Sequence, residues 1–324
     1  MTISNQLVSV TMPVHNRFIL VDEAVASVYD QTYRPIELII VDDLSDELYM
    51  PKISSEPDFE VKIIRHEENK GPGASREMGR MAAHGDYIAY LDSDDLWNPE
   101  KLEKQVAMLR AHPEAGMCYC KINDFSSLPL VGNEPISQRS GECFSAFLPT
   151  LFFGRPWGTS ACLWTRDATD RIGPWVNAWA WEDYAYDCRA GCLDIGIAYI
   201  PEVLCFTRRD QQIDQLSSRG FFKSIVNKVP ALLAISEDLL ESGKISNIET
   251  RKKFLETLRN NASTLLTYGE IESSNLLLNE LLKHLKKFTF PWLIIFLTVN
   301  VFNFVNYSAI NRIKGRIIKN IQTK

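Results

Sequence analysis

The chain has 324 residues, of which 45% are hydrophobic and 23% are charged, an ordinary balance for a globular protein with a sizeable core. This length suits one large α/β domain with an appendage, or two domains. The formal net charge of −6 excludes polyanion binding by the chain as a whole. No nucleic-acid partner is therefore expected, and any membrane contact requires a local basic patch.

The cysteines and the N-terminal residues indicate a reducing compartment. Seven cysteines occur without a CxxC pair, a pattern more typical of buried thiols than of disulfides or a zinc site. The first residues, MTISNQLVSVTMPV, contain no basic segment followed by an apolar one. The sequence therefore predicts no signal peptide and a cytoplasmic location.

The first hundred residues alternate between strand-like and helix-like segments. Their order is strand, helix, strand, strand, helix, strand, at residues 8–13, 20–31, 36–43, 59–67, 73–85 and 87–97. The third segment, IELIIVDD, is a continuous apolar run, which is typical of a strand covered on both faces. This rhythm predicts an α/β fold with a doubly wound, mostly parallel sheet.

Further elements follow along the chain. Asn98 is an expected N-cap, with Pro99 at the first position of the next helix. Residues 121–160 are rich in loop residues and aromatics, and residues 179–196 form a helix with an acidic start. The segment IAYIPEVLCFTRR, residues 197–209, is interpreted as a closing pair of strands.

The sequence changes character near residue 219, beyond which strand patterns cease. We therefore predict a catalytic domain at residues 1–219 and a helical C-terminal extension at residues 220–324. Within the extension, residues 288–319 form an amphipathic segment flanked by basic residues, whose apolar part is shorter than the roughly 18–20 residues of a membrane span. A helix lying on an anionic membrane surface is favoured over burial against the domain or a partner subunit, and a true span ranks third.

Polar residues gather where the predicted parallel strands end. The first strand ends in PVHNR (residues 13–17), the second in Asp42 and Asp43, and the fourth in DSDD (residues 92–95). In an open parallel sheet, ligands bind beyond these carboxyl ends. The three strand ends therefore predict a binding site.

The acids of this site suit a metal ion and a phosphate ligand. Neither a GxGxxG fingerprint nor a P-loop lysine motif is present, so a bound phosphate needs another source of positive charge. Asp92 and Asp94, in D-S-D spacing, offer the hard oxygen ligands that Mg²⁺ or Mn²⁺ prefers. Loop solvation or helix capping is the usual alternative for an isolated pair of this kind, but here other strand ends supply further acids.

Four ordered segments carry a resemblance to a known family. They are VSVTMPVHNR, IELIIVDDLSDE, NKGPGASREMGRMAAHGDYIAYLDSDDLWNPEKLEKQ and WEDYAYDCR. Over residues 5–210 the chain resembles family 2 glycosyltransferases with the GT-A fold. The resemblance implies inverting transfer of a sugar from a nucleotide-sugar, usually a UDP-sugar, to an acceptor hydroxyl.

The resemblance also implies roles for individual residues. In nucleotide-sugar binding, Pro13, His15 and Arg17 border the nucleotide, Asp43 accepts a hydrogen bond from the uracil imide, Arg76 approaches the nucleotide, and Asp92, Ser93 and Asp94 form the D-x-D segment. Asp94 matches the direct ligand of Mn²⁺ or Mg²⁺, and Asp92 faces the ribose or a metal-bound water.

The catalytic base implied by the resemblance is Asp183, with Glu182 as the second candidate. Without the other motifs, Asp183 reads as a helix cap, since an acid at a helix start is favoured by the helix dipole. Asp210 stands near the place where the family often has a metal-binding His, and could replace it as an oxygen ligand. A Q-x-x-R-W motif of processive synthases is missing, which indicates transfer of a single sugar.

Four tryptophans precede or adjoin the acidic pair, namely Trp157, Trp175, Trp179 and Trp181. Core packing is at least as good an interpretation as a platform for a sugar or acceptor. With the acidic helix start beside it, this segment is the candidate acceptor site.

The sequence hypothesis is a hexosyltransferase-type enzyme of cell-surface glycan synthesis, such as lipopolysaccharide, capsule or another polysaccharide. Its partners would be a nucleotide-sugar donor and a glycan or lipid-linked acceptor, reached from the inner face of the cytoplasmic membrane. Two alternatives stay open: a non-catalytic sugar- or partner-binding scaffold, and a sugar nucleotidyltransferase. The latter should carry a G-x-G-T loop after the first strand, where this chain has PVHNR.

Overall fold

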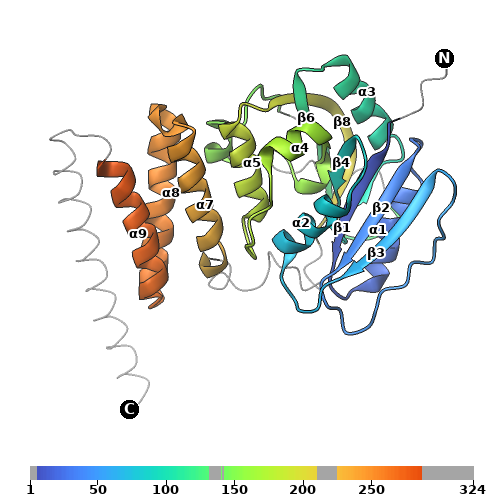
Figure 1. Cartoon of the computed structure of the whole chain (residues 1–324), viewed down its shortest axis with the longest axis horizontal. Helices are drawn as coiled ribbons and strands as arrows, with labels where there is room; N and C mark the ends of the chain where they lie inside the picture. Colours follow the sequence, from blue (N-terminus) through green and yellow to red (C-terminus); the bar gives the residue numbers. More distant parts are fainter. Residues whose placement is uncertain (1–5, 131–139, 141, 210–224, 287–324) are drawn as a thin grey trace, which may run out of the picture. The chain divides into compact units, whose positions relative to one another are not determined.

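The structure, a computed structural model, describes residues 6–130, 140, 142–209 and 225–286 (Figure 1). The chain divides into two compact units, Met1–Leu216 and Ser217–Lys324. The predicted boundary at residue 219, the segment 288–319 and Asp210 all lie outside the described residues. These three points therefore stay predictions.

The first unit is built on an eight-stranded sheet with the strand order β3-β2-β1-β4-β7-β6-β8-β5. The strands are β1 (Val8–Val14), β2 (Ile36–Asp42), β3 (Phe59–Arg65), β4 (Tyr87–Tyr90), β5 (Leu96–Trp97), β6 (Ala115–Phe125), β7 (Cys162–Thr165) and β8 (Gly196–Arg208). Strands β3, β2, β1 and β4 are mutually parallel, as are β6 and β8. Strand β7 runs antiparallel between β4 and β6, and β5 pairs antiparallel with β8. The predicted mostly parallel α/β sheet is confirmed.

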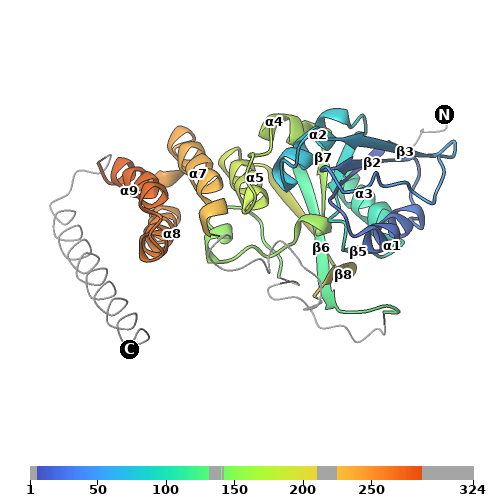
Figure 2. The same ribbon diagram turned by 90° about the horizontal axis from the view of Figure 1, so that it is seen from below.

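Helices cover both faces of this sheet. They are α1 (Phe18–Tyr29), α2 (Pro72–Ala82), α3 (Lys101–Ala111), α4 (Arg166–Ile172) and α5 (Glu182–Cys192), with 3₁₀ turns η1 (Thr150–Phe153) and η2 (Thr159–Ala161). Figure 2 shows α2 and α4 on one face and α1 and α3 on the other, the doubly wound arrangement that was predicted. Four apolar residues of α1 recur at helical spacing and are buried: Val21, Ala24, Val25 and Val28.

Two local predictions need correction, and one short strand was not predicted. Residues 197–209 form one strand, β8, and not a pair; Pro201 and Glu202 lie at a bulge, because Cys120 pairs with Ile200 and Lys121 with Val203. Helix α3 begins at Lys101, and Asn98 Oδ1 instead accepts from the Glu100 N–H at 3.0 Å in the preceding turn. The two-residue strand β5 was missed because a segment so short has no periodicity.

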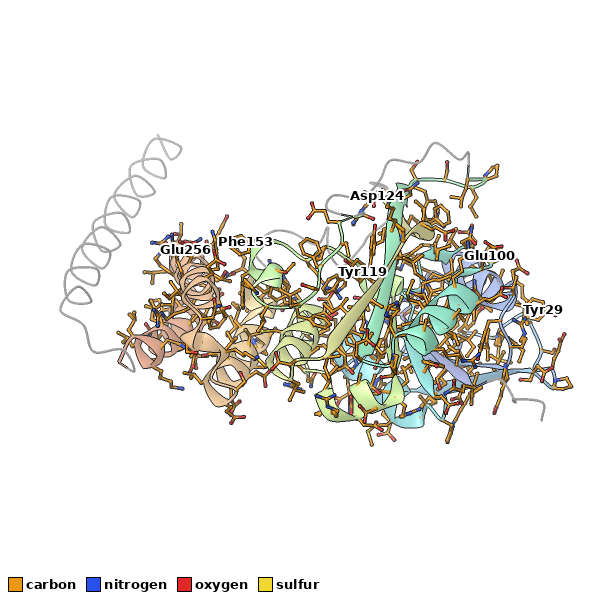
Figure 3. The ribbon with its side chains drawn as sticks, turned by 90° about the horizontal axis from the view of Figure 1, so that it is seen from above. Tyr29, Glu100, Tyr119, Asp124, Phe153 and Glu256 are labelled. Carbon is orange, nitrogen blue, oxygen red and sulfur yellow. The ribbon has the colours of Figure 1, made fainter. Side chains whose placement is uncertain are left out.

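The long strand β6 is linked to the loop that follows it. The side chains of Tyr119 and Asp124 mark the course of β6 in Figure 3. The Tyr119 hydroxyl donates to the Glu142 carbonyl oxygen at 2.8 Å and accepts from the Phe144 N–H at 3.0 Å. This ties the loop after β6 back onto the sheet.

The second unit is helical throughout its described residues, as predicted. It contains α7 (Val229–Glu241), the 3₁₀ turn η4 (Lys244–Ser246), α8 (Ile248–Thr267) and α9 (Ile271–Lys286). Its core is formed by buried apolar side chains, among them Leu232, Ile235, Phe254, Leu258, Leu265 and Leu277. None of the helices in residues 6–286 that the structure describes has the length and apolar character needed to cross a membrane.

Helix α2 lies unusually close to the central strand β1. A Cβ atom added to Gly79 would stand 2.0 Å from Cγ2 of Thr11, which is fully buried in β1. A contact this short requires a shift of the strand or of the helix, because the Thr11 side chain has no free space. The absence of a side chain at residue 79 therefore sets the separation of α2 from the sheet.

We expect Gly79→Ala to lower the free energy of unfolding by about 1–3 kcal/mol, because overpacking a tight interface outweighs the gain in helix propensity. Urea unfolding measures the change. Thr11→Ser removes the methyl group that clashes, so the double variant should lose less stability than the sum of the two single variants. Additive losses would contradict the proposed contact.

Candidate active site

The parallel strands β1, β2 and β4 bring their carboxyl ends to one edge of the sheet. After β1 the chain turns through Asn16 and Arg17, which both adopt left-handed backbone conformations with φ of 57° and 58°. Arg17 Nη1 lies 3.2 Å from Asp94 Oδ2, beyond β4. His15 Nδ1 lies 2.9 Å from the carbonyl oxygen of Asp43, beyond β2. The end of β1 thus contacts both neighbouring strand ends.

Asp43 anchors the loop that leads into α2. Its two carboxylate oxygens accept hydrogen bonds from the backbone N–H groups of Lys70 and Gly71, both at 2.8 Å. Pro13 occupies the penultimate position of β1, and Asn69 Nδ2 lies 3.3 Å from His15 Nε2. His15 and Asp43 are therefore gathered at the loop that leads into α2.

The loop of residues 92–95, here called the acidic loop, is held by main-chain and buried contacts. Ser160 Oγ accepts from the Asp92 N–H at 3.1 Å and donates to Asp95 Oδ2 at 2.7 Å. Arg208, at the end of β8, donates from its backbone N–H to Asp95 Oδ1 at 3.2 Å and from Nε to the Asp94 carbonyl oxygen at 3.2 Å. Asp95 is thus used inside the protein, and the side chains of Asp92 and Asp94 face the edge of the sheet.

Like charges accumulate in the acidic loop. Burial, and then the charge of Asp92, raises the pKa of Asp94 against the opposing effect of Arg17. Burial, and then the charges of Asp94 and Asp92, raises the pKa of Asp95 well above its usual range. A cation at this loop would relieve the repulsion.

The donor set fits a metal ion that takes most of its ligands from elsewhere. Within the described ranges, no cluster of three or more His, Cys, Asp or Glu side chains is arranged to hold a metal. Asp92 and Asp94 supply two hard oxygen donors, and Mg²⁺ or Mn²⁺ commonly completes its shell with phosphate oxygens and water. The two aspartates therefore fit the predicted ion, but only together with a ligand.

Arg76 joins the acidic loop to the start of α5. From α2, its guanidinium contacts Asp92 Oδ1 at 2.6 Å and Glu182 Oε1 at 2.5 Å. The residue is only 4% exposed, and its guanidinium carbon lies 5.2 Å from the centre of the Trp175 ring. The structure thus places Arg76 between two carboxylates, while its predicted approach to the nucleotide stays a prediction.

The neighbouring acids Glu182 and Asp183 have different surroundings. The Glu182 side chain is 8% exposed and faces Arg76, whereas the Asp183 side chain is 28% exposed. Asp183 Oδ2 accepts from Arg155 Nη1 at 2.5 Å and from the Thr159 hydroxyl at 3.1 Å, and Oδ1 accepts from the Tyr184 N–H at 2.7 Å. Asp183 is therefore the more accessible acid.

The pKa values of this pair are pushed apart. Burial, and then the charge of Asp183, raises the pKa of Glu182 to about 7, although Arg76 opposes the shift. Burial acts in the same sense on Asp183, but Arg155, Arg76 and the two hydrogen bonds outweigh it and lower the pKa of Asp183. At neutral pH Asp183 is ionised and can accept a proton.

Two of the four tryptophans fit core packing, and the other two leave open the platform for a sugar or acceptor. Trp157 and Trp175 are 3% and 6% exposed, as expected for core packing. Trp179 is 37% exposed and covers Gly71, where an added Cβ would stand 2.9 Å from its ring. Trp181 packs on Tyr184 with ring centroids 4.8 Å apart, directly before the acidic pair.

Several residues of the site were not predicted from the sequence: Arg155, Thr159, Ser160, Arg208 and Glu23, which forms an ion pair with Arg208. Only Arg208 had a usable signal, because it ends a strand beside the predicted metal-shell position. The others lie in the loop-rich region or on a helix face, where no motif distinguishes them.

Comparison with known proteins relates part of the first unit to a described family. Residues 9–135 match the family described as Glycosyl transferase family 2. The UDP-Glc:alpha-D-GlcNAc-diphosphoundecaprenol beta-1,3-glucosyltransferase WfgD of Escherichia coli is 37% identical over 103 residues, which cover 32% of this chain and 41% of WfgD. Across three curated relatives the matched segment spans between 38% and 44% of the relative, less than half of its length.

Two solved structures share the fold at low identity. TarS 1–349 of S. aureus in complex with UDP-GlcNAc has a TM-score of 0.56 and 16% identity, covering 83% of this chain and 89% of TarS 1–349. The mannosyltransferase PcManGT of Pyrobaculum calidifontis, in complex with GDP-Man and Mn²⁺, has a TM-score of 0.50 and 14% identity, covering 96% of this chain and 88% of that protein. The predicted GT-A-type fold is thereby confirmed.

The raised pKa of Glu182 predicts how Glu182→Gln changes stability. Between the ordinary pKa of 4.5 and the folded value of about 7, the folded protein keeps a proton that the unfolded chain has lost. The free energy of unfolding of the natural chain therefore falls as the pH rises through this window. The variant does not show this fall, because Gln carries no titrating group. We expect its free energy of unfolding relative to the natural chain to increase by about 3 kcal/mol between about pH 5 and about pH 8.

Urea unfolding of both proteins at several pH values measures this difference. Because both proteins carry the same other titrating groups, those contributions largely cancel in the comparison. A stability difference that is independent of pH would show that Glu182 is ionised in the folded protein throughout the window.

Proposed function

We propose that the chain, whose residues 9–135 match glycosyl transferase family 2, transfers a single sugar from a nucleotide-sugar, most simply a UDP-sugar, to a hydroxyl group of a cell-surface glycan precursor. The observation that carries the proposal is the Arg76 bridge. It ties Asp92 of the acidic loop to Glu182, and so brings the donor acids and the neighbouring Asp183 to one edge of the sheet.

In this proposal the strand ends bind the donor. Pro13, His15, Arg17 and Asp43 border the nucleotide, and Ser93 belongs to the acidic loop beneath the sugar diphosphate. A Mn²⁺ or Mg²⁺ ion held by Asp94 and Asp92 supplies positive charge to the departing diphosphate. The loop is already positioned by Ser160 and Arg208, so the two aspartates need little reorganisation on binding.

Asp183 is the proposed base. It takes the proton of the acceptor hydroxyl while the acceptor oxygen forms a bond to the anomeric carbon from the face opposite the diphosphate. The bond between that carbon and the diphosphate oxygen breaks, the nucleoside diphosphate leaves, and the configuration inverts. The lowered pKa of Asp183 keeps it ionised for this task, and its exposure of 28% keeps it accessible.

The relatives support the class of donor and acceptor. The name of WfgD specifies UDP-Glc as donor and a GlcNAc-diphosphoundecaprenol as acceptor, and TarS was solved with UDP-GlcNAc. A lipid-linked acceptor would place the enzyme at the inner face of the membrane. Residues 288–319 are the sequence prediction for that contact.

The aromatic side chains of Trp179 and Trp181, which precede the acidic pair, are the proposed acceptor surface. Trp179 covers the backbone of Gly71, whose N–H is bound by Asp43. Trp181 packs against Tyr184, in the first turn of α5, with the two rings tilted by 31°. An aromatic ring next to the base suits the apolar face of a sugar.

Replacing the two functional acids separately tests the proposal. We expect Asp183→Asn to slow sugar transfer by about 10²-fold or more while nucleotide binding persists, because only proton acceptance is lost. Asp94→Asn should instead weaken Mn²⁺-dependent binding of the nucleotide. A panel of UDP-, GDP- and dTDP-sugars, assayed for binding, hydrolysis and transfer, provides the measurements. Asp167→Asn, at an exposed position of α4, is the matched control.

The outcomes separate the alternatives. A natural chain that binds nucleotide-sugars but neither hydrolyses nor transfers them would be a scaffold. Failure to bind any member of the panel would refute the proposed function. Full activity in Asp183→Asn would show that another residue is the base, with Glu182 as the next candidate.

Trp179→Ala tests the acceptor surface. We expect the KM for the acceptor to rise by roughly 3- to 10-fold, because a ring that stacks on a sugar is lost. Hydrolysis of the donor without acceptor should change little. Trp179→Phe keeps an aromatic face over Gly71 and should lie close to the natural chain. An equal effect on donor hydrolysis in Trp179→Ala would instead assign Trp179 to the donor loop.

A further inference from the structure

We infer that Arg155 is a positioning residue for the base Asp183, and that the buried carboxylate of Asp187 holds Arg155 in place for that role. The inference rests on the proposed function of Asp183 and adds the residues that position it. Its basis is the way one guanidinium spans two acids of the same helix.

Arg155 lies in the loop between η1 and η2 and reaches the first turns of α5. Its Nη1 donates to Asp183 Oδ2 at 2.5 Å, and its Nε donates to Asp187 Oδ2 at 2.5 Å. Nη1 also donates to the Thr159 hydroxyl at 3.3 Å, which itself donates to Asp183 Oδ2. Residues 183 and 187 are one helical turn apart, so a planar fork can contact both.

Asp187 is buried and holds Arg155 in place. Its side chain is 2% exposed, against 28% for Asp183. The same oxygen that binds Arg155 also accepts from the indole N–H of Trp157 at 2.8 Å. Trp157 is buried against Tyr119 and Phe147, with ring centroids 4.8 Å and 5.3 Å away. Arg155 and Trp157 thus fix their loop to α5 through one carboxylate.

This arrangement keeps the buried charges compensated while a proton moves. If Asp183 were the only partner of Arg155, protonation of Asp183 would leave a largely buried guanidinium without a counter-charge, which is costly. Asp187 supplies a counter-charge that does not take part in the reaction. Asp183 can therefore gain and release a proton without displacing Arg155.

Asp183 faces charged groups on three elements. Arg155 comes from the η1–η2 loop, Arg76 from α2, and Glu182 and Asp187 from α5 itself. Among the effects that lower the pKa of Asp183, that of Arg155 is the largest. Loss of Arg155 therefore raises the pKa of Asp183, and loss of the Asp187 charge lowers it.

The two variants should shift the pH profile of transfer in opposite directions. Since the base acts when ionised, the acidic limb of the kcat profile should move to higher pH by roughly one unit or more in Arg155→Met, and to lower pH in Asp187→Asn. In Arg155→Met, kcat should fall at least about tenfold, while the KM for the nucleotide-sugar stays near that of the natural chain. Arg155→Lys, which keeps a cation but not the fork, should return the limb toward its natural position.

Arg80→Met is the matched control. Arg80 is as little exposed as Arg155, at 15%, and also lies against two carboxylates, Glu77 and Asp170, but it does not contact Asp183. This variant should leave the acidic limb where it is. A fall of kcat in Arg155→Met with no movement of the limb would reduce Arg155 to a structural role and overturn the inference.

A measurement without substrate separates this inference from the proposed function. The pKa of the Asp183 carboxyl, followed by carbon NMR of labelled aspartate, should rise in Arg155→Met, lie nearer its natural value in Arg155→Lys and fall in Asp187→Asn. The same shifts in a chain that transfers no sugar would uphold the Arg155–Asp187 arrangement and refute the proposed function. Active protein with an unmoved Asp183 pKa would refute the inference alone.

Discussion

A single buried guanidinium, that of Arg76, holds the geometry of the candidate site. It lies between Asp92 and Glu182 and against the face of Trp175. Burying the charges of Arg76 and Glu182 is expensive, and well-packed apolar side chains would often be as stable or more so. The bridge is therefore better explained by position than by stability, because it fixes α2, the acidic loop and the start of α5 relative to one another. Removing one partner would leave a charge buried without compensation.

The same rule organises the rest of the edge. Each acid that faces the site is held at one oxygen by an arginine from a different element: Asp94 by Arg17 of the β1–α1 turn, Asp92 by Arg76 of α2 and Asp183 by Arg155 of the η1–η2 loop. In the proposed function, such pre-aligned charges would require little reorganisation when a diphosphate or an acceptor binds, and this pre-alignment is the main source of electrostatic catalysis.

The sequence could predict what depends on local patterns and could not predict what depends on distant contacts. The helical spacing of Val21, Ala24, Val25 and Val28 reports burial directly, and the strand-end rule located Asp43 and the acidic loop. Arg155 and Ser160 had no such signal, because their partners lie in other segments of the chain. The closing strand was misread for a related reason. Its bulge at Pro201 looks like a turn until the register with β6 is known.

The choice between Glu182 and Asp183 shows how burial separates residues that the sequence presents as equals. Successive residues of a helix point about 100° apart, so one acid of the pair can face inward while the other faces the edge. Arg76 occupies the inward side and pairs with Glu182, whose pKa rises to about 7, whereas Arg155 and the Tyr184 N–H stabilise the charge on Asp183. Two adjacent carboxylates whose pKa values are driven apart are suited to different tasks. Glu182 therefore belongs to the scaffold that carries Arg76, and Asp183 is the acid proposed to meet an acceptor hydroxyl.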